Sequence, residues 1–248
     1  MAKMVGLSRN LKLSWLNQTV ELVSSNLVEN EIKEKLNEYL SFEIGSPTNI
    51  RKTREILMYI WHYENEYTEK LRPTALELIK KYPDYALEIH WCMMLAAYPV
   101  FMDMCKLIGK MSEFQDEITL AQLKQKLFDE WGERTTLYHS IDKLISTLKE
   151  FGVLACDKPG KYHINRHKVA KDEINSFMVY TIINVDGSGY YLFQEVNASS
   201  YLFPFECTVS KEMLLQDERF TMNNFGGSLS VALKLSFCKC FQNVCFCW

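Results

Sequence analysis

Proline and glycine, the residues that most often interrupt helices and strands, are scarce in this chain. Six prolines and ten glycines occur among 248 residues, which argues against a disordered chain. Hydrophobic residues make up 48% and charged residues 24%, close to an ordinary globular protein. We therefore expect long elements around a sizeable core, enough for one large domain or two small ones.

The chain also lacks a long hydrophobic run. No apolar stretch reaches the roughly 18–20 residues that a membrane-spanning helix needs. The first ten residues contain Lys3 and Arg9 but no apolar segment typical of a signal peptide. These absences predict a soluble, cytoplasmic protein that does not engage a membrane.

Motifs for catalysis are missing as well. The sequence contains no glycine-rich phosphate loop, no Gly-x-Ser-x-Gly and no metalloprotease helix motif. Among the five histidines, His90 lies in an apolar segment and is expected to be a core residue. His163 and His167 are four residues apart but fall on different predicted elements. We predict a non-enzymatic protein with no catalytic residue and no cofactor.

The net charge is small. It is −3 at pH 7, which argues against a protein that coats nucleic acid through bulk positive charge. Residues 119–168 nevertheless carry seven lysines and two arginines against six acidic residues, a net charge of +3. Any contact with DNA therefore has to come from a local surface of this kind.

Hydrophobic periodicity predicts an N-terminal helical bundle over residues 1–113. Apolar residues recur three or four positions apart, as on one face of a helix, and five or six helices result. Ser46 and Asp84 are predicted N-caps, and Arg72-Pro73 is the predicted start of the fourth helix. Residues 85–98 are apolar on nearly every side, which is typical of a central helix.

Residues 114–170 have the element order of a winged helix-turn-helix. Thr119 is the expected N-cap of the first helix, and Gly152 ends the second helix. The expected elements are helices at 119–131 and 135–151, strands at 153–156 and 161–164, and a turn at 157–160.

The pattern is weaker over residues 171–248, where we expect a small mixed α/β region. Residues 173–185 fit either a helix or a strand, and short strands or turns are expected at 190–209 and 219–234. A helical turn is expected after Ser210. The predicted fold class is therefore mainly α (α+β).

The second helix of a DNA-binding helix-turn-helix lies in the major groove. Its expected outward residues are polar and suited to phosphates or base edges: Thr135, Thr136, His139, Lys143 and Ser146. Basic residues in and after the hairpin extend this surface: Lys158, Lys161, Arg166 and Lys168. Asp142 lies within the face and repels phosphate. A protein–protein or purely structural role is the alternative interpretation.

A second basic cluster lies in the third predicted helix. Arg51, Lys52 and Arg54 follow the polar residues 46–49. Backbone amides at a helix N-terminus next to cationic side chains can form a cradle for phosphate. The alternative is a solvated face whose charges pair with Glu55 or other neighbours.

The arrangement resembles the BrxA-like family of BREX phage-defence systems, in which a NusB-like helical bundle is joined to a winged helix. The resemblance covers roughly residues 10–165 and is carried by residues 46–57, 89–95 and 136–154. It implies DNA binding and a role in phage resistance beside a methyltransferase and other BREX proteins. It also assigns Arg51, Lys52 and Arg54 to the nucleic-acid surface of the bundle.

Eight cysteines occur in the chain. Four form two Cys-x-Cys pairs at the C-terminus: Cys238, Cys240, Cys245 and Cys247. Four thiolates can hold zinc, but the usual spacing is Cys-x-x-Cys, and the apolar surroundings also fit a terminal strand. We predict no metal site. The others are expected to be buried free thiols: Cys92, Cys105, Cys156 and Cys207.

The preferred interpretation is a non-enzymatic, DNA-binding accessory protein of a BREX-type defence system. Its expected partners are double-stranded DNA and other BREX proteins, and the sequence does not indicate an oligomeric state. The alternative is a scaffold or assembly factor that uses the bundle and the winged helix to bind proteins without touching DNA.

Overall fold

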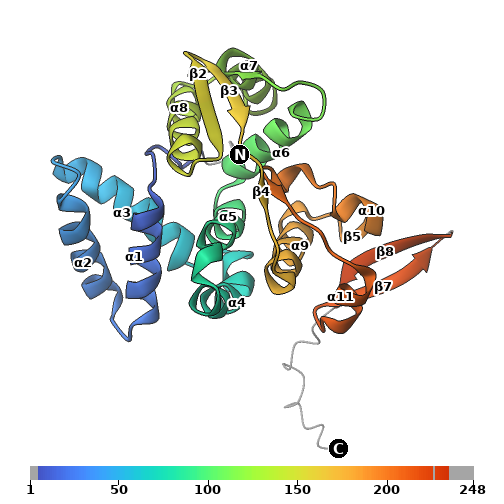
Figure 1. Cartoon of the computed structure of the whole chain (residues 1–248). Helices are drawn as coiled ribbons and strands as arrows, with labels where there is room; N and C mark the ends of the chain where they lie inside the picture. Colours follow the sequence, from blue (N-terminus) through green and yellow to red (C-terminus); the bar gives the residue numbers. More distant parts are fainter. Residues whose placement is uncertain (1–4, 226, 235–248) are drawn as a thin grey trace, which may run out of the picture.

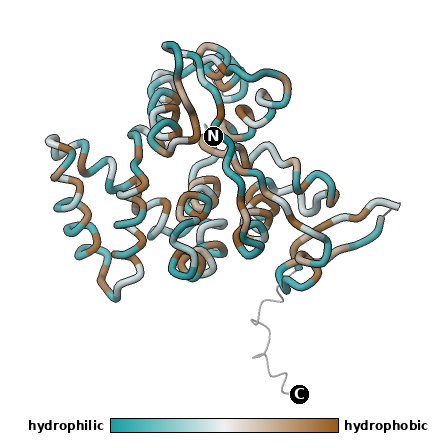
Figure 2. The backbone as a smooth tube through the Cα atoms, viewed as in Figure 1, coloured by the Kyte–Doolittle hydropathy of each residue, from teal (hydrophilic) through white to brown (hydrophobic). Residues whose placement is uncertain are grey.

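The protein is mainly helical, with small sheets in its middle and C-terminal parts. A computed structural model describes residues 5–225 and 227–234. The first six helices are α1 (Leu13–Ser24), α2 (Glu29–Ser41), α3 (Pro47–Trp61), α4 (Thr68–Lys81), α5 (Ala86–Ala97) and α6 (Pro99–Met111). Hydrophobic and hydrophilic residues alternate along α1 and α2 (Figure 2), which is the pattern of helices buried on one side only.

The central helix of the bundle is α5, as the sequence predicts. All of its residues except Leu87 are buried. It contacts α3, α4, α6 and α9, the last formed by Asp172–Asp186, and lies between them in Figure 1. A helix without a polar face can be stable in water only when other elements surround it.

No single helix in the described part of the chain is long and apolar enough to cross a membrane. The two helical segments Pro83–Ala97 and Pro99–Met111 would have the length and apolar composition of a membrane span only if they were joined end to end. The two helices bend by 118° at the break between them.

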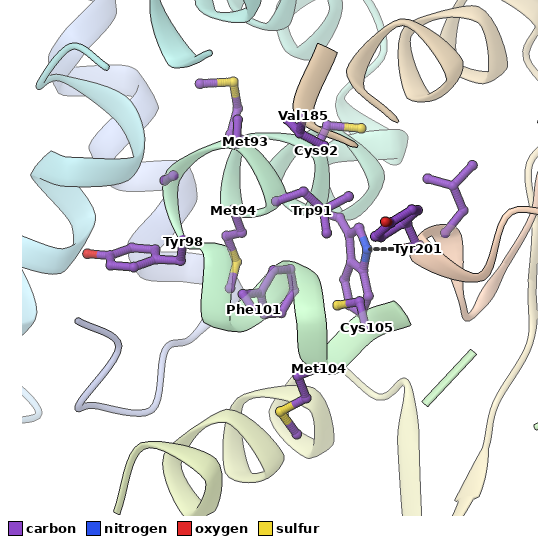
Figure 3. Packing of buried hydrophobic residues seen from close by; sticks show 14 of the residues in the cluster. Trp91, Cys92, Met93, Met94, Tyr98, Phe101, Met104, Cys105, Val185 and Tyr201 are labelled. Atoms are coloured by element: carbon purple, nitrogen blue, oxygen red, sulfur yellow. Dashed lines mark hydrogen bonds between the residues drawn. The ribbon is translucent and has the colours of Figure 1, made fainter. Parts of the chain in front are cut away.

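Trp91 of α5 joins the bundle to the C-terminal part of the chain (Figure 3). Its ring centroid lies 4.9 Å from that of Phe101, 5.3 Å from Phe203 and 5.2 Å from Phe205. The indole Nε1–H donates a hydrogen bond to the backbone carbonyl of Tyr201 at 3.3 Å. The polar atom of a fully buried tryptophan is thus satisfied by a residue 110 positions away.

Two boundaries of the bundle differ from the prediction. Helix α4 begins at Thr68, not at Arg72-Pro73, because the Asn65 side chain accepts hydrogen bonds from the Tyr67 and Thr68 amides at 2.9 and 2.8 Å. Pro73 therefore lies inside the helix, where its missing N–H removes one backbone hydrogen bond.

The prediction that Asp84 caps the central helix is also wrong. A 3₁₀ turn, η1 (Pro83–Tyr85), precedes α5, whose N-cap position is Tyr85. Ser46 does occupy the N-cap position of α3, but its side chain makes no capping hydrogen bond.

The middle part of the chain packs two helices on a three-stranded antiparallel sheet. Its elements are β1 (Ile118–Thr119), α7 (Leu120–Trp131), α8 (Thr135–Glu150), β2 (Leu154–Lys158) and β3 (Lys161–Ile164). The strand order is β1-β3-β2. The predicted cap is confirmed, since Thr119 Oγ1 accepts the Gln122 N–H at 3.2 Å. Gly152 follows α8 with a φ of +73°, a conformation that favours glycine.

The C-terminal part begins with β4 (His167–Lys168). The ambiguous residues 173–185 lie in helix α9, most of which is buried against α4 and α5. The remaining elements are β5 (Tyr190–Leu192), α10 (Phe193–Val196), η2 (Ser200–Leu202), β6 (Phe205–Glu206), α11 (Lys211–Gln216), β7 (Phe220–Phe225) and β8 (Ser228–Leu233). Strand β4 pairs in parallel with β6, and the other three strands form a sheet in the order β5-β8-β7. The predicted helical turn after Ser210 is confirmed as α11.

One continuous cluster of buried hydrophobic residues extends through all three parts, from Val5 to Val231. Cys92, Cys105 and Cys207 are buried free thiols, as expected, whereas Cys156 is exposed. Cys156 lies on β2 near the hairpin turn, where the strand extends beyond the helices that cover its beginning.

Glycine at position 109 is required by the close approach of α6 to η2. A Cβ atom at Gly109 would lie 2.1 Å from the carbonyl oxygen of Ser200 and 2.8 Å from its Cα. We expect Gly109→Ala to lower the free energy of unfolding by about 2–3 kcal/mol, because backbone atoms would have to shift. Chemical denaturation measures this loss. Gly45→Ala is the control, since no atom lies within 4 Å of its added Cβ, and equal stability of both variants would contradict the expectation.

His90 is a fully buried core residue, as the sequence predicts, and its hydrogen bonds hold it in one neutral tautomer. The Trp61 indole N–H donates to His90 Nδ1 at 3.1 Å, so the ring proton lies on Nε2, which donates to Asn17 Oδ1 at 2.8 Å. Burial lowers the pKa of His90 to about 3. Protonation would place two donors, Nδ1–H and the indole N–H, against each other.

This arrangement predicts a pH-dependent stability. Between pH 6 and 4 the unfolded chain binds a proton at His90 that the native state does not, so stability falls as the pH falls. The contribution is about 1.4 kcal/mol per pH unit. We expect the free energy of unfolding of the wild type to exceed that of His90→Gln by the largest margin at pH 8. This difference should shrink by about 1.4 kcal/mol per pH unit between pH 6 and 4. Denaturation at several pH values measures this difference, and parallel curves would refute the assignment.

Candidate nucleic-acid interface

Helix α8 has one buried side and one open side. The apolar stripe that includes Leu137, Ile141 and Leu144 is fully buried against the rest of the fold. All the predicted contact residues lie off this stripe: Thr135, Thr136, His139 and Ser146 are exposed and Lys143 is half-buried. The helix lies at the edge of the molecule (Figure 1), so its polar side is accessible to a partner.

The charge of Asp142, which would repel phosphate, is balanced by a lysine of the neighbouring helix. Lys124 Nζ of α7 lies 2.7 Å from Asp142 Oδ1 and 3.4 Å from the ring centroid of Tyr138. Burial lowers the pKa of Lys124, but its hydrogen bonds to Asp142 and Tyr138 outweigh this effect and raise it. Lys124 therefore stays charged at neutral pH, and its pairing with Asp142 adds no net positive charge to the face.

Lys158 is the predicted cation that remains available at the hairpin. It is exposed beside the turn, and no ion pair joins it to any described residue. Lys161, by contrast, lies 2.5 Å from Glu117, whose pKa it lowers through their hydrogen bond. His163 is held by Asp157, with Nε2 and Oδ2 3.1 Å apart. The hairpin thus offers a single unpaired lysine near its tip.

Arg166 and Lys168 lie away from that tip, although both are exposed. Strand β3 starts at the turn with Lys161 and runs away from it toward Ile164. The chain then leaves the sheet, and Lys168 lies in β4, which pairs with β6 of the C-terminal part. The structure therefore does not bring these two residues together with Lys158.

The basic residues of α3 divide into two groups. Arg51 and Lys52 are exposed, and neither forms an ion pair within the described chain. The Arg54 guanidinium donates from Nε to Glu55 Oε1 and from NH1 to Asn37 Oδ1, both at 3.0 Å. Arg54 therefore links α3 to α2. It pairs with Glu55, as the alternative to a phosphate cradle predicts for this residue.

An extended N-terminal segment, residues 5–12, connects the bundle to α8. Leu7 and Leu11 are fully buried, and the Leu11 amide donates to Thr147 Oγ1 of α8 at 2.9 Å. Arg9 donates to Asn49 Oδ1 of α3 at 2.9 Å. In Figure 1 this segment rises from α1 and passes between α3 and α8. It thereby connects α3 with α8.

Sequence reasoning missed two cations of this region. Lys149 is exposed and lies one turn after Ser146, a spacing that identifies it as part of the open side of α8. Arg9 lies in a segment with no helical period, so no pattern in the sequence indicates that it reaches α3.

The four cysteines of the two Cys-x-Cys pairs, Cys238, Cys240, Cys245 and Cys247, lie outside the described residues. Among the residues that are described, no group of three histidine, cysteine, aspartate or glutamate side chains is arranged to hold a metal ion.

No protein-family model, no curated protein and no solved structure matches this chain. The resemblance to BrxA-like proteins therefore stays a prediction, and the function has to be argued from the geometry of the site.

The contacts of Arg54 predict a structural role for this residue. We expect Arg54→Gln to lower the free energy of unfolding by about 1 kcal/mol, because Glu55 and Asn37 lose a half-buried charged partner. Arg51→Gln and Lys52→Gln should stay within about 0.5 kcal/mol of the wild type. Thermal and urea denaturation of the three variants compare them directly. A loss for Lys52→Gln as large as that for Arg54→Gln would contradict this division.

Proposed function

We propose that this protein is a non-enzymatic accessory factor that binds double-stranded DNA in the cytoplasm. In this proposal residues 114–170 act as a winged helix-turn-helix, with α8 in the major groove and the β2–β3 hairpin as the wing. The order of helices and strands and the exposed hairpin support this interpretation.

The observation that carries the proposal is the open polar side of α8. Its first turns present Thr135, Thr136 and His139, followed by Lys143 and Ser146. The major groove of B-DNA admits one α-helix, and hydroxyl, imidazole and ammonium groups bond to phosphates or base edges there. Because Lys124 balances Asp142, Lys143 leaves this side of the helix with a positive charge.

Cations on both flanks of α8 extend the surface along a duplex. Lys158 lies on the hairpin, and Arg51 and Lys52 lie on α3. None of the proposed base-contacting side chains has the bidentate geometry of arginine, asparagine or glutamine. We therefore expect weak sequence preference and an affinity governed by phosphate contacts, which falls steeply with salt.

The resemblance of the sequence to BrxA-like proteins supports a place for this factor in a BREX-type phage-defence system. There it would act beside a methyltransferase and the other components of the system. Co-purification with products of neighbouring genes tests this part of the proposal separately from DNA binding.

Charge reversal on the proposed DNA surface provides the central test. Lys149→Glu with Lys158→Glu should weaken binding to a 20-base-pair duplex at least about tenfold at 50 mM salt. The slope of log affinity against log salt concentration should also become less negative by about two. Fluorescence anisotropy at 50 and 200 mM salt measures both quantities.

The matched control is Lys70→Glu with Lys211→Glu, which changes the net charge equally on α4 and α11. Both lysines are exposed and lie on helices far from α8 in Figure 1. Their variant should bind within about twofold of the wild type, because the contact is local rather than a consequence of net charge. Equal losses in both double variants would contradict a specific surface.

A protein-binding scaffold is the second candidate. Tyr138 supports it, because this aromatic side chain is 46% exposed on α8 and stacks on Phe128 of α7, and exposed aromatic residues are frequent at protein interfaces. If the folded wild type fails to bind duplex DNA at 50 mM salt, the DNA proposal is wrong and the scaffold is favoured.

A further inference from the structure

An open cavity lies where the N-terminal segment, α3 and α8 meet. Its volume is about 330 Å³, within the size range of small-molecule sites, roughly 300–1,000 Å³. Its polar lining comes from four separate parts of the chain, and the residues used below are Arg9, Lys12, Glu43, Asn49, Thr53 and Lys143.

The cavity carries excess positive charge. Arg9, Lys12 and Lys143 face one carboxylate, that of Glu43. Glu43 is already engaged, because it bonds to Lys12 and accepts the Trp15 indole N–H at 3.0 Å. These contacts lower its pKa, so it is ionised at neutral pH and offsets only Lys12. No other carboxylate lines the cavity to face Arg9 and Lys143, although Glu150 lies near enough to act on Lys12.

The hydrogen bonds of Arg9 leave room for an anion. Its guanidinium donates to the Ser8 carbonyl and to Asn49 Oδ1, both of which are neutral acceptors. The Nε atom is buried and has no hydrogen-bond partner among the described residues. Lys143 likewise forms no ion pair in the described chain. Cations that converge without acidic partners are typical of phosphate-binding sites.

Thr53 adds a hydroxyl group to the lining of the cavity. It is 1% exposed and lines the cavity, yet its hydroxyl has no hydrogen bond to any described residue. Buried threonines in helices of this protein normally bond to the carbonyl four residues earlier, as Thr19 and Thr181 do. The Thr53 oxygen is not among the buried polar atoms that lack a partner, so it is accessible from the cavity and can bond to a ligand there.

The N-terminal end of α3 reinforces the attraction for an anion. Pro47 has no N–H, Ser46 makes no side-chain cap, and the amides of Thr48 and Asn49 have no hydrogen-bond acceptor within the described residues. Uncapped amides and the positive end of the helix dipole lie next to Asn49 and Thr53, which line the cavity.

We propose that this cavity binds a phosphate group, held by Arg9, Lys143 and the hydroxyl of Thr53. The phosphate can belong to a DNA strand that runs beside α8 or to a small phosphorylated molecule. In either case it joins the N-terminal segment, α3 and α8 through one anion. The site does not depend on the DNA proposal, because free phosphate satisfies the same groups.

The test uses the full chain and two probes, inorganic phosphate and a 20-base-pair duplex. Isothermal titration calorimetry at constant ionic strength should detect phosphate binding to the wild type. Thr53→Val and Lys143→Met should weaken it at least fivefold, because each removes one ligand with little change in volume. Thr74→Val and Lys70→Met on α4, outside the cavity, are the controls and should bind phosphate like the wild type.

The two probes separate the possible sources of the phosphate. If only the duplex binds, and Thr53→Val weakens it fivefold while Thr74→Val does not, the site holds a DNA phosphate. If inorganic phosphate binds with the expected variant pattern and the duplex does not, the site holds and the DNA proposal fails. Absence of phosphate binding, together with equal duplex affinity for the wild type and Thr53→Val, overturns the site.

Discussion

The burial of α5 is the constraint on which the rest of the structure depends. This helix has no polar side, so elements from both halves of the chain have to cover it. Trp91 shows how this is achieved, since its ring packs on Phe101 from the bundle and on Phe203 and Phe205 from the C-terminal part. A fully buried tryptophan contributes several kcal/mol to folding, and its indole N–H is satisfied from the same side. The helical bundle, the middle part and the C-terminal part of the chain therefore share one hydrophobic core.

That shared core determines where the functional surfaces lie. The outward side of α8 stays open because its apolar stripe is buried toward the rest of the fold. The N-terminal segment then joins α8 to α3 through Leu11 and Arg9. A rigid connection of this kind keeps charged groups from different elements at fixed separations. Such preorganisation reduces the entropy that a partner has to remove when it binds.

Electrostatic pairing divides the cations of the protein into structural and available groups. Arg54 and Lys161 are held by acidic neighbours, and Lys124 balances Asp142. Arg9, Arg51, Lys52 and Lys143, which form no ion pair with a described residue, lie on the N-terminal segment, α3 and α8. Lys143 belongs both to the proposed DNA surface and to the lining of the cavity. The two proposals are thus neighbours in space but are supported by different observations, an open helix side and a cavity in which the buried Arg9 Nε has no partner among the described residues.

The sequence alone determined the features that depend on neighbours a few residues apart. Helical periods, the Thr119 cap and the glycine after α8 involve contacts within one or two turns, so local patterns predict them. Tertiary structure decided which charges remain available, because Arg54 meets Asn37 and Lys124 meets Asp142 across separate helices. It also placed Arg9 against Asn49, forty residues away. The physical reason is that Coulomb and hydrogen-bond energies depend on distances in space, and only the packing of the core brings residues so distant in sequence within bonding range.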